Sequence, residues 1–236
     1  MLKLSKLTKS FGAIAVADQI SFSVSKGDAV GILGPNGAGK TSLFNLITGT
    51  LQADSGSIEF SDRDISSYSA AKRCKLGMAR SFQVPQPFAK LTVFENALVA
   101  ALHGAGLTKK QANNHALTVL EDTGLVDKAN STAGSLTLLE RKRLEMARAL
   151  AAKPSLLLLD EIAGGLTEAE CSSLIDTIKT VQGKGTTIIW IEHVVHALLA
   201  VAERLVVMDF GKVIAEGEPK VILQSDAVKE IYLGIE

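Results

Sequence analysis

The sequence has few cysteines, prolines and aromatic residues, no long apolar run and no excess of charge of either sign. Cys74 and Cys171 are far apart and form no metal-ligand or redox spacing, so we expect two reduced thiols, as in cytoplasmic proteins. Residues 1–7 lack the continuous apolar stretch of a signal peptide. The least polar segments, such as 97–102 and 197–202, are far shorter than the roughly 20 residues that span a bilayer. Contact with a membrane is therefore expected only through a partner protein.

The charge balance and composition narrow the class of protein further. Lys plus Arg and Asp plus Glu both number 25, so no overall field favours nucleic acid or anionic lipid as a partner. The chain has 236 residues, of which 47% are hydrophobic, and only 5 prolines. These values are typical of an ordered globular protein and exclude a disordered or fibrous one. We expect a single domain over residues 1–236 and no nucleic acid partner.

The N-terminal part has the pattern of strands followed by a loop and a helix. Apolar and polar residues alternate over 2–7 and 20–24, as in half-buried strands. The apolar run at 28–33 predicts a buried strand, which leads into a glycine-rich turn. From 39 to 48 the apolar residues recur at helical spacing. A strand, a glycine-rich loop and a helix in this order are the expected setting of a phosphate-binding motif.

The middle of the chain is predicted to be helical. Helical periodicity covers 92–102, 108–123 and 137–152, and glycines separate these pieces. The pattern indicates a helical subdomain over about 92–152, inserted into an α/β core.

The last third alternates strand-like and helical segments. Strand-like runs at 156–159, 186–191 and 205–208 are separated by helical stretches, which is typical of a mainly parallel sheet covered by helices. Gly211 and Gly217 bracket a short final strand, and residues 227–233 have a helical pattern. The sequence therefore predicts the α/β class.

The glycine-rich turn fits the phosphate-loop pattern, with one additional glycine. Its residues are Gly34, Pro35, Asn36, Gly37, Ala38, Gly39, Lys40, Thr41 and Ser42. Glycines let successive backbone N–H groups point at an anion, and the start of the following helix adds its positive end. Lys40 is expected at the β and γ phosphates, the Thr41 hydroxyl at Mg²⁺ and Ser42 at the α phosphate. The segment predicts binding of ATP with Mg²⁺; the alternative is a glycine-rich turn without a ligand.

A pair of carboxylates follows the apolar strand at 156–159. Asp160 and Glu161 stand at its C-terminal end, where ligands bind in open parallel sheets. Asp160 is expected to hold Mg²⁺ through its water shell, and Glu161 to polarise the water that attacks the γ phosphate. The alternative is a solvated strand end.

With these motifs, Gln83, the segment 136–150 and His193 occur in the order and spacing of the ATP-binding subunits of ABC transporters. The resemblance covers the whole chain. It implies an ATPase with a P-loop NTPase core and a mainly parallel sheet, an N-terminal antiparallel β subdomain and an inserted helical subdomain.

The resemblance also implies roles for residues outside the two motifs. Phe11 stands where an aromatic residue stacks on adenine, and Gln83 matches the glutamine that reaches Mg²⁺ and the attacking water. His193 matches the histidine that contacts the γ phosphate and orders the catalytic glutamate. Taken alone, these residues are also compatible with a core or turn aromatic, a solvated loop amide and a structural histidine.

The segment 136–150 is similar to the family signature but departs from its usual Leu-Ser-Gly-Gly-Gln opening. Thr137 replaces serine, two leucines replace the glycines, and Glu140 replaces glutamine. The resemblance implies that Thr137 contacts the γ phosphate of ATP held by another subunit. From the residues alone, Thr137 and Glu140 form a capping box worth about 1 kcal/mol at the start of a helix.

Within the family, the segments 44–49, 80–83, 91–96, 191–196 and 231–234 resemble the ATPases of branched-chain amino acid importers. This implies three kinds of partner: a second ABC ATPase subunit in a homodimer or heterodimer, transmembrane permease subunits and, indirectly, a solute-binding protein. The chain would then lie on the cytoplasmic, inner face of the cell membrane. Two alternatives stay open, a soluble regulatory ATPase and a mainly ATP-sensing member of an asymmetric pair.

The loop after Gln83 is predicted to meet the permease. Pro85 and Pro87 stiffen it, and its apolar residues Val84 and Phe88 are expected to be exposed in the isolated subunit.

Overall fold

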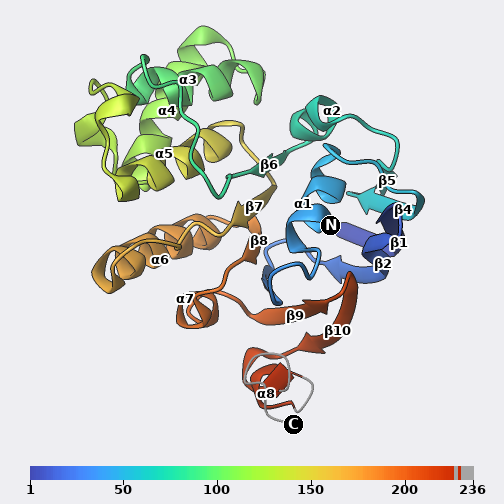
Figure 1. Ribbon diagram of the computed structural model, residues 1–236. Coiled ribbons are helices and arrows are strands. Elements are labelled where there is room, and N and C mark those ends of the chain that lie inside the picture. Colours follow the sequence, from blue (N-terminus) through green and yellow to red (C-terminus); the bar gives the residue numbers. More distant parts are fainter. Residues whose placement is uncertain (226–227, 230–236) are drawn as a thin grey trace. The chain divides into compact units, whose positions relative to one another are not determined.

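The computed structural model describes residues 1–225 and 228–229 and divides into two compact units. The first unit consists of residues 1–73 and the described residues from 189 on, and the second consists of residues 74–188. The elements of the first unit are β1 (Leu2–Phe11), β2 (Ile14–Val24), β3 (Ala29–Leu33), α1 (Lys40–Thr48), β4 (Ser55–Phe60), β5 (Arg63–Asp64), α7 (Val195–Leu199), β9 (Arg204–Asp209), β10 (Lys212–Gly217) and α8 (Pro219–Gln224) (Figure 1).

The elements of the second unit are β6 (Met78–Arg80), α3 (Val93–His103), α4 (Lys109–Asp122), α5 (Leu138–Ala151), β7 (Leu156–Asp160) and α6 (Glu168–Gly183). Short 3₁₀ turns lie at Val126–Lys128 and Ala133–Ser135, between α4 and α5. The chain passes between the units within α2 (Ala70–Lys75) and within β8 (Thr187–Ile191).

The N-terminal sheet is antiparallel, in the order β2-β1-β4-β5. Leu2 and Leu4 of β1 are buried, as the period of two requires, but the next buried leucine is Leu7. The change of phase is caused by a bulge, because Lys6 has a φ of 47° and the register against β2 shifts between Leu4 and Leu7. The bulge turns Leu7 back to the core face.

The strand before the phosphate loop is buried along its whole length. All five residues of β3 are inaccessible to solvent, and β3 pairs in parallel with β9, which pairs antiparallel with β10. A fully buried apolar run is what a covered parallel strand requires. The buried strand predicted at 28–33 is therefore confirmed.

The end of α1 is held by a buried arginine. Arg73 is only 1% exposed, and its guanidinium donates to the carbonyls of Leu46 at 2.7 Å and Ile47 at 2.8 Å, and to those of Ser66 and Tyr68. The last carbonyls of a helix lack partners within the helix, so a cation there is favourable. Burial lowers the pKa of Arg73, and the Asp64 carboxylate opposes that shift.

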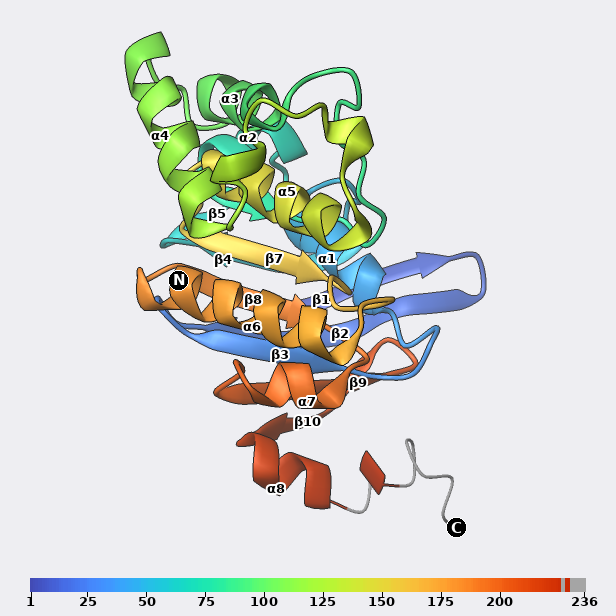
Figure 2. The ribbon, with the colours of Figure 1, turned by 90° about the vertical axis from the view of Figure 1, so that its left-hand side faces the viewer.

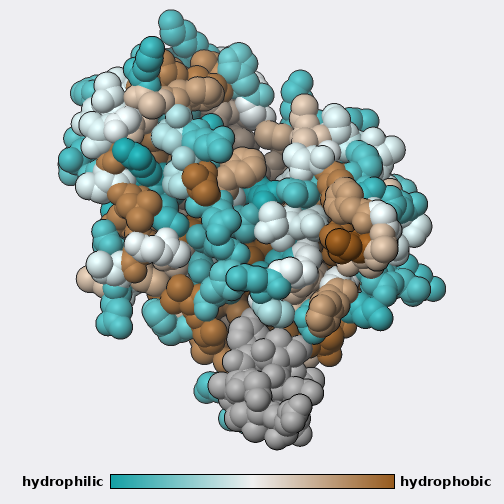
Figure 3. Space-filling view, in the orientation of Figure 1, coloured by the Kyte–Doolittle hydropathy of each residue, from teal (hydrophilic) through white to brown (hydrophobic). Residues whose placement is uncertain are grey.

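In the second unit, α3, α4 and α5 form one apolar core, to which Val93, Leu120 and Leu144 contribute. Hydrophobic residues are scattered among hydrophilic ones on the face of this helical group seen in Figure 3. The helices begin with Thr92, Thr108 and Thr137, each followed three residues later by a Glu or Gln that bonds back to it. The three predicted helical pieces are confirmed.

The second unit also contains a parallel strand pair and a crossover helix. β6 pairs in parallel with β7, with Met78 opposite Leu156. Figure 2 shows α6 running back along β7 before the chain enters β8. With the β3 and β9 pair, these strands confirm the α/β class with mainly parallel pairing. The single domain over residues 1–236 stays a prediction. The predicted helix at 227–233 and the motif at 231–234 lie outside the described residues, except for 228 and 229.

Candidate nucleotide-binding and hydrolysis site

The phosphate loop lies between β3 and α1, and close backbone contacts require its glycines. A side chain at Gly34 would meet the Met208 carbonyl at 2.3 Å, and one at Gly39, whose φ is 96°, would meet the Val16 carbonyl at 2.3 Å. Gly37 has a φ of 84°, and in the described part of the chain no atom beyond its two chain neighbours lies within 4 Å of the position that a Cβ would take. A glycine is therefore favoured at position 37 by the left-handed backbone conformation, and space is left open beside the loop.

Lys40 folds back into the phosphate loop. It is 5% exposed, and its Nζ donates to the carbonyl oxygens of Gly34 at 2.7 Å and Pro35 at 2.8 Å. Thr41 is exposed and Ser42 half-buried in the first turn of α1, which contains no acidic residue. The positive end of α1 and a lysine ammonium therefore act at the same loop, which is suited to a phosphate chain.

The tips of two hairpins carry exposed aromatic rings. Phe11, at the end of β1, is 55% exposed, and the Lys9 Nζ lies 5.5 Å from its ring centroid. Phe210, between β9 and β10, is 82% exposed with a φ of 41°. The following Gly211 donates its N–H to the Ala38 carbonyl at 3.0 Å, which ties this turn to the phosphate loop.

Sequence reasoning selected Phe11 but missed Phe210. An aromatic residue in a hairpin turn gives a weak sequence signal, and the strained backbone appears only in the structure.

His193 follows β8, as predicted, and its side chain is exposed. Its backbone N–H donates to the Glu192 carboxylate at 3.0 Å, and Val194 N–H contacts the same oxygen at 3.4 Å. Glu192 is 1% exposed, so a buried carboxylate fixes the turn that carries His193.

In the second unit, the predicted magnesium ligand Asp160 ends β7 as part of an ion pair. Its Oδ2 lies 2.5 Å from Nη2 of Arg80, and both side chains are almost fully buried. Arg80 ends β6, and the parallel pairing of β6 with β7 brings the two side chains together. This contact could not be predicted from the sequence, because Arg80 and Asp160 are far apart along the chain.

Glu161 and Gln83, both predicted to act on the attacking water, are in contact. Nε2 of Gln83 donates to Oε2 of Glu161. Glu161 has a φ of 47°, and its carbonyl accepts from the buried Lys142 Nζ at 3.4 Å. A non-glycine residue in this left-handed region costs about 1–3 kcal/mol, and such strain clusters at functional positions. Lys142 was missed because it lies inside an ordinary helical pattern.

The signature-like segment begins α5 with the predicted capping box. The Thr137 side chain accepts from Glu140 N–H at 3.4 Å, and the Glu140 carboxylate accepts from Thr137 N–H at 2.9 Å. This backbone bond lowers the pKa of Glu140, and Lys128 lies 3.4 Å from its carboxylate. Thr137 itself is exposed. The cap is confirmed, and the contact with another subunit's nucleotide stays a prediction.

The loop after Gln83 presents apolar side chains to solvent. Val84 is 66% exposed and Phe88 is 48% exposed, as predicted. Buried Asn96 holds the Phe88 backbone through bonds of 2.9 Å and 3.2 Å, and Arg148 of α5 donates to the Gln86 carbonyl at 2.8 Å. The loop is therefore exposed but fixed by two helices.

A family model described as ABC transporter matches residues 17–164. The chain belongs to the ABC transporter family. It is an ATP-binding and ATP-hydrolysing enzyme of the ABC type and the ATPase subunit of a transporter. This result confirms the resemblance, the fold class and the ATPase prediction.

Similar proteins in the family are named for different transport systems. The chain is 33% identical to the probable branched-chain amino acid transport ATP-binding protein LivG of Methanocaldococcus jannaschii, over 99% of this chain and 97% of that protein. It is 34% identical to the lipopolysaccharide export system ATP-binding protein LptB of Escherichia coli, with the same coverage. The structure is similar to a solved ATP-binding cassette of an ABC transporter in its ADP conformation, with a TM-score of 0.89 and 32% sequence identity. The match covers 100% of this chain and 99% of the solved chain. No helix in the part of the chain that the structure describes is long and apolar enough to cross a membrane.

Proposed function

We propose that this chain powers a membrane importer of small polar solutes, with branched-chain or related amino acids as the favoured substrates. The similarity to LivG over nearly the whole chain supports import, whereas the similarity to LptB makes export the second candidate. The observation that carries the hydrolytic part of the proposal is the contact between Gln83 and Glu161 at the end of β7.

In this proposal the phosphate loop, residues 34–42, binds the phosphates of ATP, and Phe11 stacks on the adenine. Lys40 exchanges its carbonyl partners for phosphate oxygens, which keeps its ammonium hydrogen-bonded in both states. Magnesium would supply neutralisation of phosphate charge. Thr41, Asp160 and Gln83 offer the oxygen donors that this ion prefers. Among the described residues, no three His, Cys, Asp or Glu side chains are grouped so that they could hold a metal ion.

Glu161 is the general base in this proposal. Its carboxylate takes a proton from water, and the water oxygen bonds to the γ phosphorus while the bond from that phosphorus to the bridging oxygen breaks. The products are ADP and phosphate. Gln83 holds the water and the Glu161 carboxylate, and His193 contacts the γ phosphate and positions Glu161. Thr137 acts on ATP bound by a second ABC ATPase subunit.

The proposed assembly contains two ABC ATPase subunits, transmembrane permease subunits and, through them, a solute-binding protein, with this chain on the inner face of the cell membrane. The exposed, fixed loop at 84–88 is suited to hold a permease helix, because a docking surface must be accessible yet ordered. A soluble regulatory ATPase would have no need of this surface.

The experiment is purification of the tagged chain from membranes of its own host, followed by reconstitution of the complex in lipid vesicles. We expect a permease to copurify and ATP hydrolysis to rise when leucine and its binding protein are present. Stimulation by lipopolysaccharide instead would establish export. Recovery without any membrane protein, at unchanged ATPase activity, would establish the regulatory alternative.

A further inference from the structure

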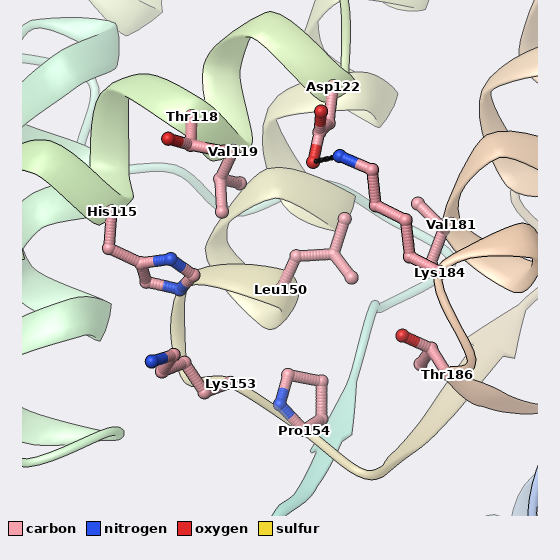
Figure 4. Close-up of a pocket in the computed structure, with 10 residues that line it drawn as sticks. All are labelled: His115, Thr118, Val119, Asp122, Leu150, Lys153, Pro154, Val181, Lys184 and Thr186. Atoms are coloured by element: carbon pink, nitrogen blue, oxygen red, sulfur yellow. Dashed lines mark hydrogen bonds and ion pairs between the residues drawn. The ribbon is translucent and has the colours of Figure 1, made fainter.

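A cavity of about 440 Å³ lies in the second unit, between α4, the C-terminal end of α5 and the C-terminal end of α6 (Figure 4). This volume is within the range of about 300–1,000 Å³ typical of small-molecule sites. None of its lining residues belongs to the predicted nucleotide site. The cavity includes Pro154, just before β7, whereas Asp160 is the last residue of that strand, whose five residues span roughly 17 Å.

The cavity has an apolar wall contributed by three helices. Val119 of α4 and Val181 of α6 are 4% and 3% exposed, and Leu150 of α5 lies between them in Figure 4. Thr118 and Thr186 add hydroxyl groups beside this wall. An aliphatic group of a ligand could therefore be removed from water here, at a gain of about 0.8 kcal/mol per CH₂.

The polar side of the cavity has an excess of positive charge. Lys184 pairs with Asp122 at 2.5 Å, so these two charges offset each other. Lys153 has no ion-pair partner within residues 1–225 and 228–229. One ammonium group thus remains for an anion. A second negative charge on the ligand would meet the Lys184 and Asp122 pair, whose charges already offset each other, and would gain little there.

The backbone conformation at Lys153 favours glycine, which suggests that the lysine side chain has a function at this position. The chain leaves α5 through Lys153 with a φ of 53°, and it leaves α6 through Gly185 with a φ of 88°. The N–H of Lys153 and the N–H of Gly185 each donate to the carbonyl three residues earlier, at 2.8 Å. Glycine is the residue normally found at such a left-handed helix end. At α5 a lysine occupies the position and is strained by it, and its side chain lines the cavity.

His115 offers a second polar atom. Its Nε2 is buried and has no hydrogen-bond partner among residues 1–225 and 228–229. In Figure 4 the ring projects from α4 toward the cavity above Lys153. Burial lowers the pKa of His115, and Lys153 lowers it further, against smaller opposing effects of the Leu150 and Ala151 carbonyls and of Asp122. A buried polar atom without a partner is costly, and a ligand oxygen at Nε2 would relieve that cost.

We propose that this cavity binds a small amphipathic monocarboxylate, whose carboxylate lies between Lys153 and Nε2 of His115 and whose aliphatic group packs on Leu150 and Val181. The single uncompensated ammonium selects one negative charge, and the apolar wall selects a hydrocarbon tail. A carboxylate beside the ring favours the charged imidazolium, so binding raises the pKa of His115 and becomes tighter as pH falls through that pKa. Asp122, Lys153 and Lys184 are the charged groups that line the cavity with this ring.

The probe is hexanoate, compared with hexan-1-ol, hexylammonium and adipate, each titrated into the full chain while the His115 ring signals are followed by NMR. We expect saturable binding of hexanoate with a dissociation constant on the order of 1 mM. The other three probes should bind at least about tenfold more weakly, and the His115 pKa should rise only with hexanoate.

The decisive variant is Lys153→Gly. It removes the ammonium and the strain together, so we expect affinity for hexanoate to fall about tenfold or more while the melting temperature stays equal or rises. Lys179→Met, on the exposed face of α6, is the matched control and should bind as the parent chain does. Equal binding of hexanoate and hexan-1-ol, unchanged affinity in Lys153→Gly, or no saturable binding of hexanoate would each overturn the proposal.

Discussion

Glu161 combines an acidic side chain with a left-handed backbone, and its neighbours show how that conformation is held. The Gln83 amide donates to its carboxylate and the Lys142 ammonium contacts its carbonyl, so both ends of the residue are fixed. A base held in this way needs little reorganisation when it receives a proton. Removal of this carboxylate is therefore expected to affect hydrolysis rather than ATP binding.

Glu161→Gln should retain ATP binding and reduce hydrolysis by at least about 100-fold, because the amide keeps the shape of the side chain and cannot accept the proton. Phosphate release and equilibrium ATP binding measure the two effects separately. Glu168→Gln, an exposed change at the start of α6, is the control and should hydrolyse normally. Near-normal turnover by Glu161→Gln at saturating ATP would remove Glu161 from the role of base.

At the scale of elements, segments whose signal lies in their own residues were predictable. α3, α4 and α5 begin with a threonine and a Glu or Gln three residues later, and their apolar residues recur at helical spacing. α2 carries no such pattern, and its buried Arg73 bonds to carbonyls 26 and 27 residues earlier in the chain. The bulge at Lys6 was missed for a similar reason, since it depends on pairing with β2.

The candidate site shows the same division. The phosphate loop and the acidic pair were recognisable because each is a short run of sequence with a known chemical purpose. The roles of Gln83 and His193 came from the resemblance to a family. The ion pair of Arg80 with Asp160 and the contact of Lys142 with Glu161 arise only when distant segments fold together.

Replacement of Arg73 by methionine should lower the free energy of unfolding by about 3 kcal/mol, because four carbonyl groups lose a buried donor and only apolar volume replaces it. Urea unfolding followed by circular dichroism measures the change. Arg63→Met, an exposed change on β5, should stay within about 0.5 kcal/mol of the parent. A loss below 1 kcal/mol for Arg73→Met would show that water replaces the guanidinium.

Val84→Glu should weaken assembly with the permease while leaving the hydrolysis rate of the isolated subunit within about twofold, because an exposed side chain can take a charge without a folding cost. Copurification with the permease and basal phosphate release are the two measurements. Val126→Glu, exposed elsewhere in the same unit, is the matched control. Unfolding of Val84→Glu, or normal assembly, would contradict a role of this loop in docking.

At the scale of the whole molecule, the proposal makes the active site a property of two subunits. Lys40→Ala breaks the phosphate loop and Thr137→Arg blocks the signature contact, so each variant alone should be inactive. A mixed dimer would contain one site with both parts intact. We expect mixing to restore measurable hydrolysis, on the order of a quarter of the parent rate for random pairing with one working site per mixed dimer.

Subunit exchange, followed with two different tags, is the control for the mixing experiment. If the mixed dimer forms and stays inactive although one working site suffices, Thr137 serves only as the cap of α5. Thr137→Ser preserves the cap, because serine keeps the hydroxyl. This variant should hydrolyse ATP at the rate of the parent chain in either case.

The contact between Arg73 and the last carbonyls of α1 also affects the opposite end of that helix. The negative end of the α1 macrodipole is neutralised by a buried guanidinium, while the first turn carries no acidic residue. An anion at Gly39 therefore experiences the positive end of the helix with little opposing field from the far end, about 13 Å away. We therefore expect Arg73 to contribute electrostatically to phosphate affinity at the proposed site from a distance, and Arg73→Met to weaken binding of pyrophosphate under conditions where the fold remains intact.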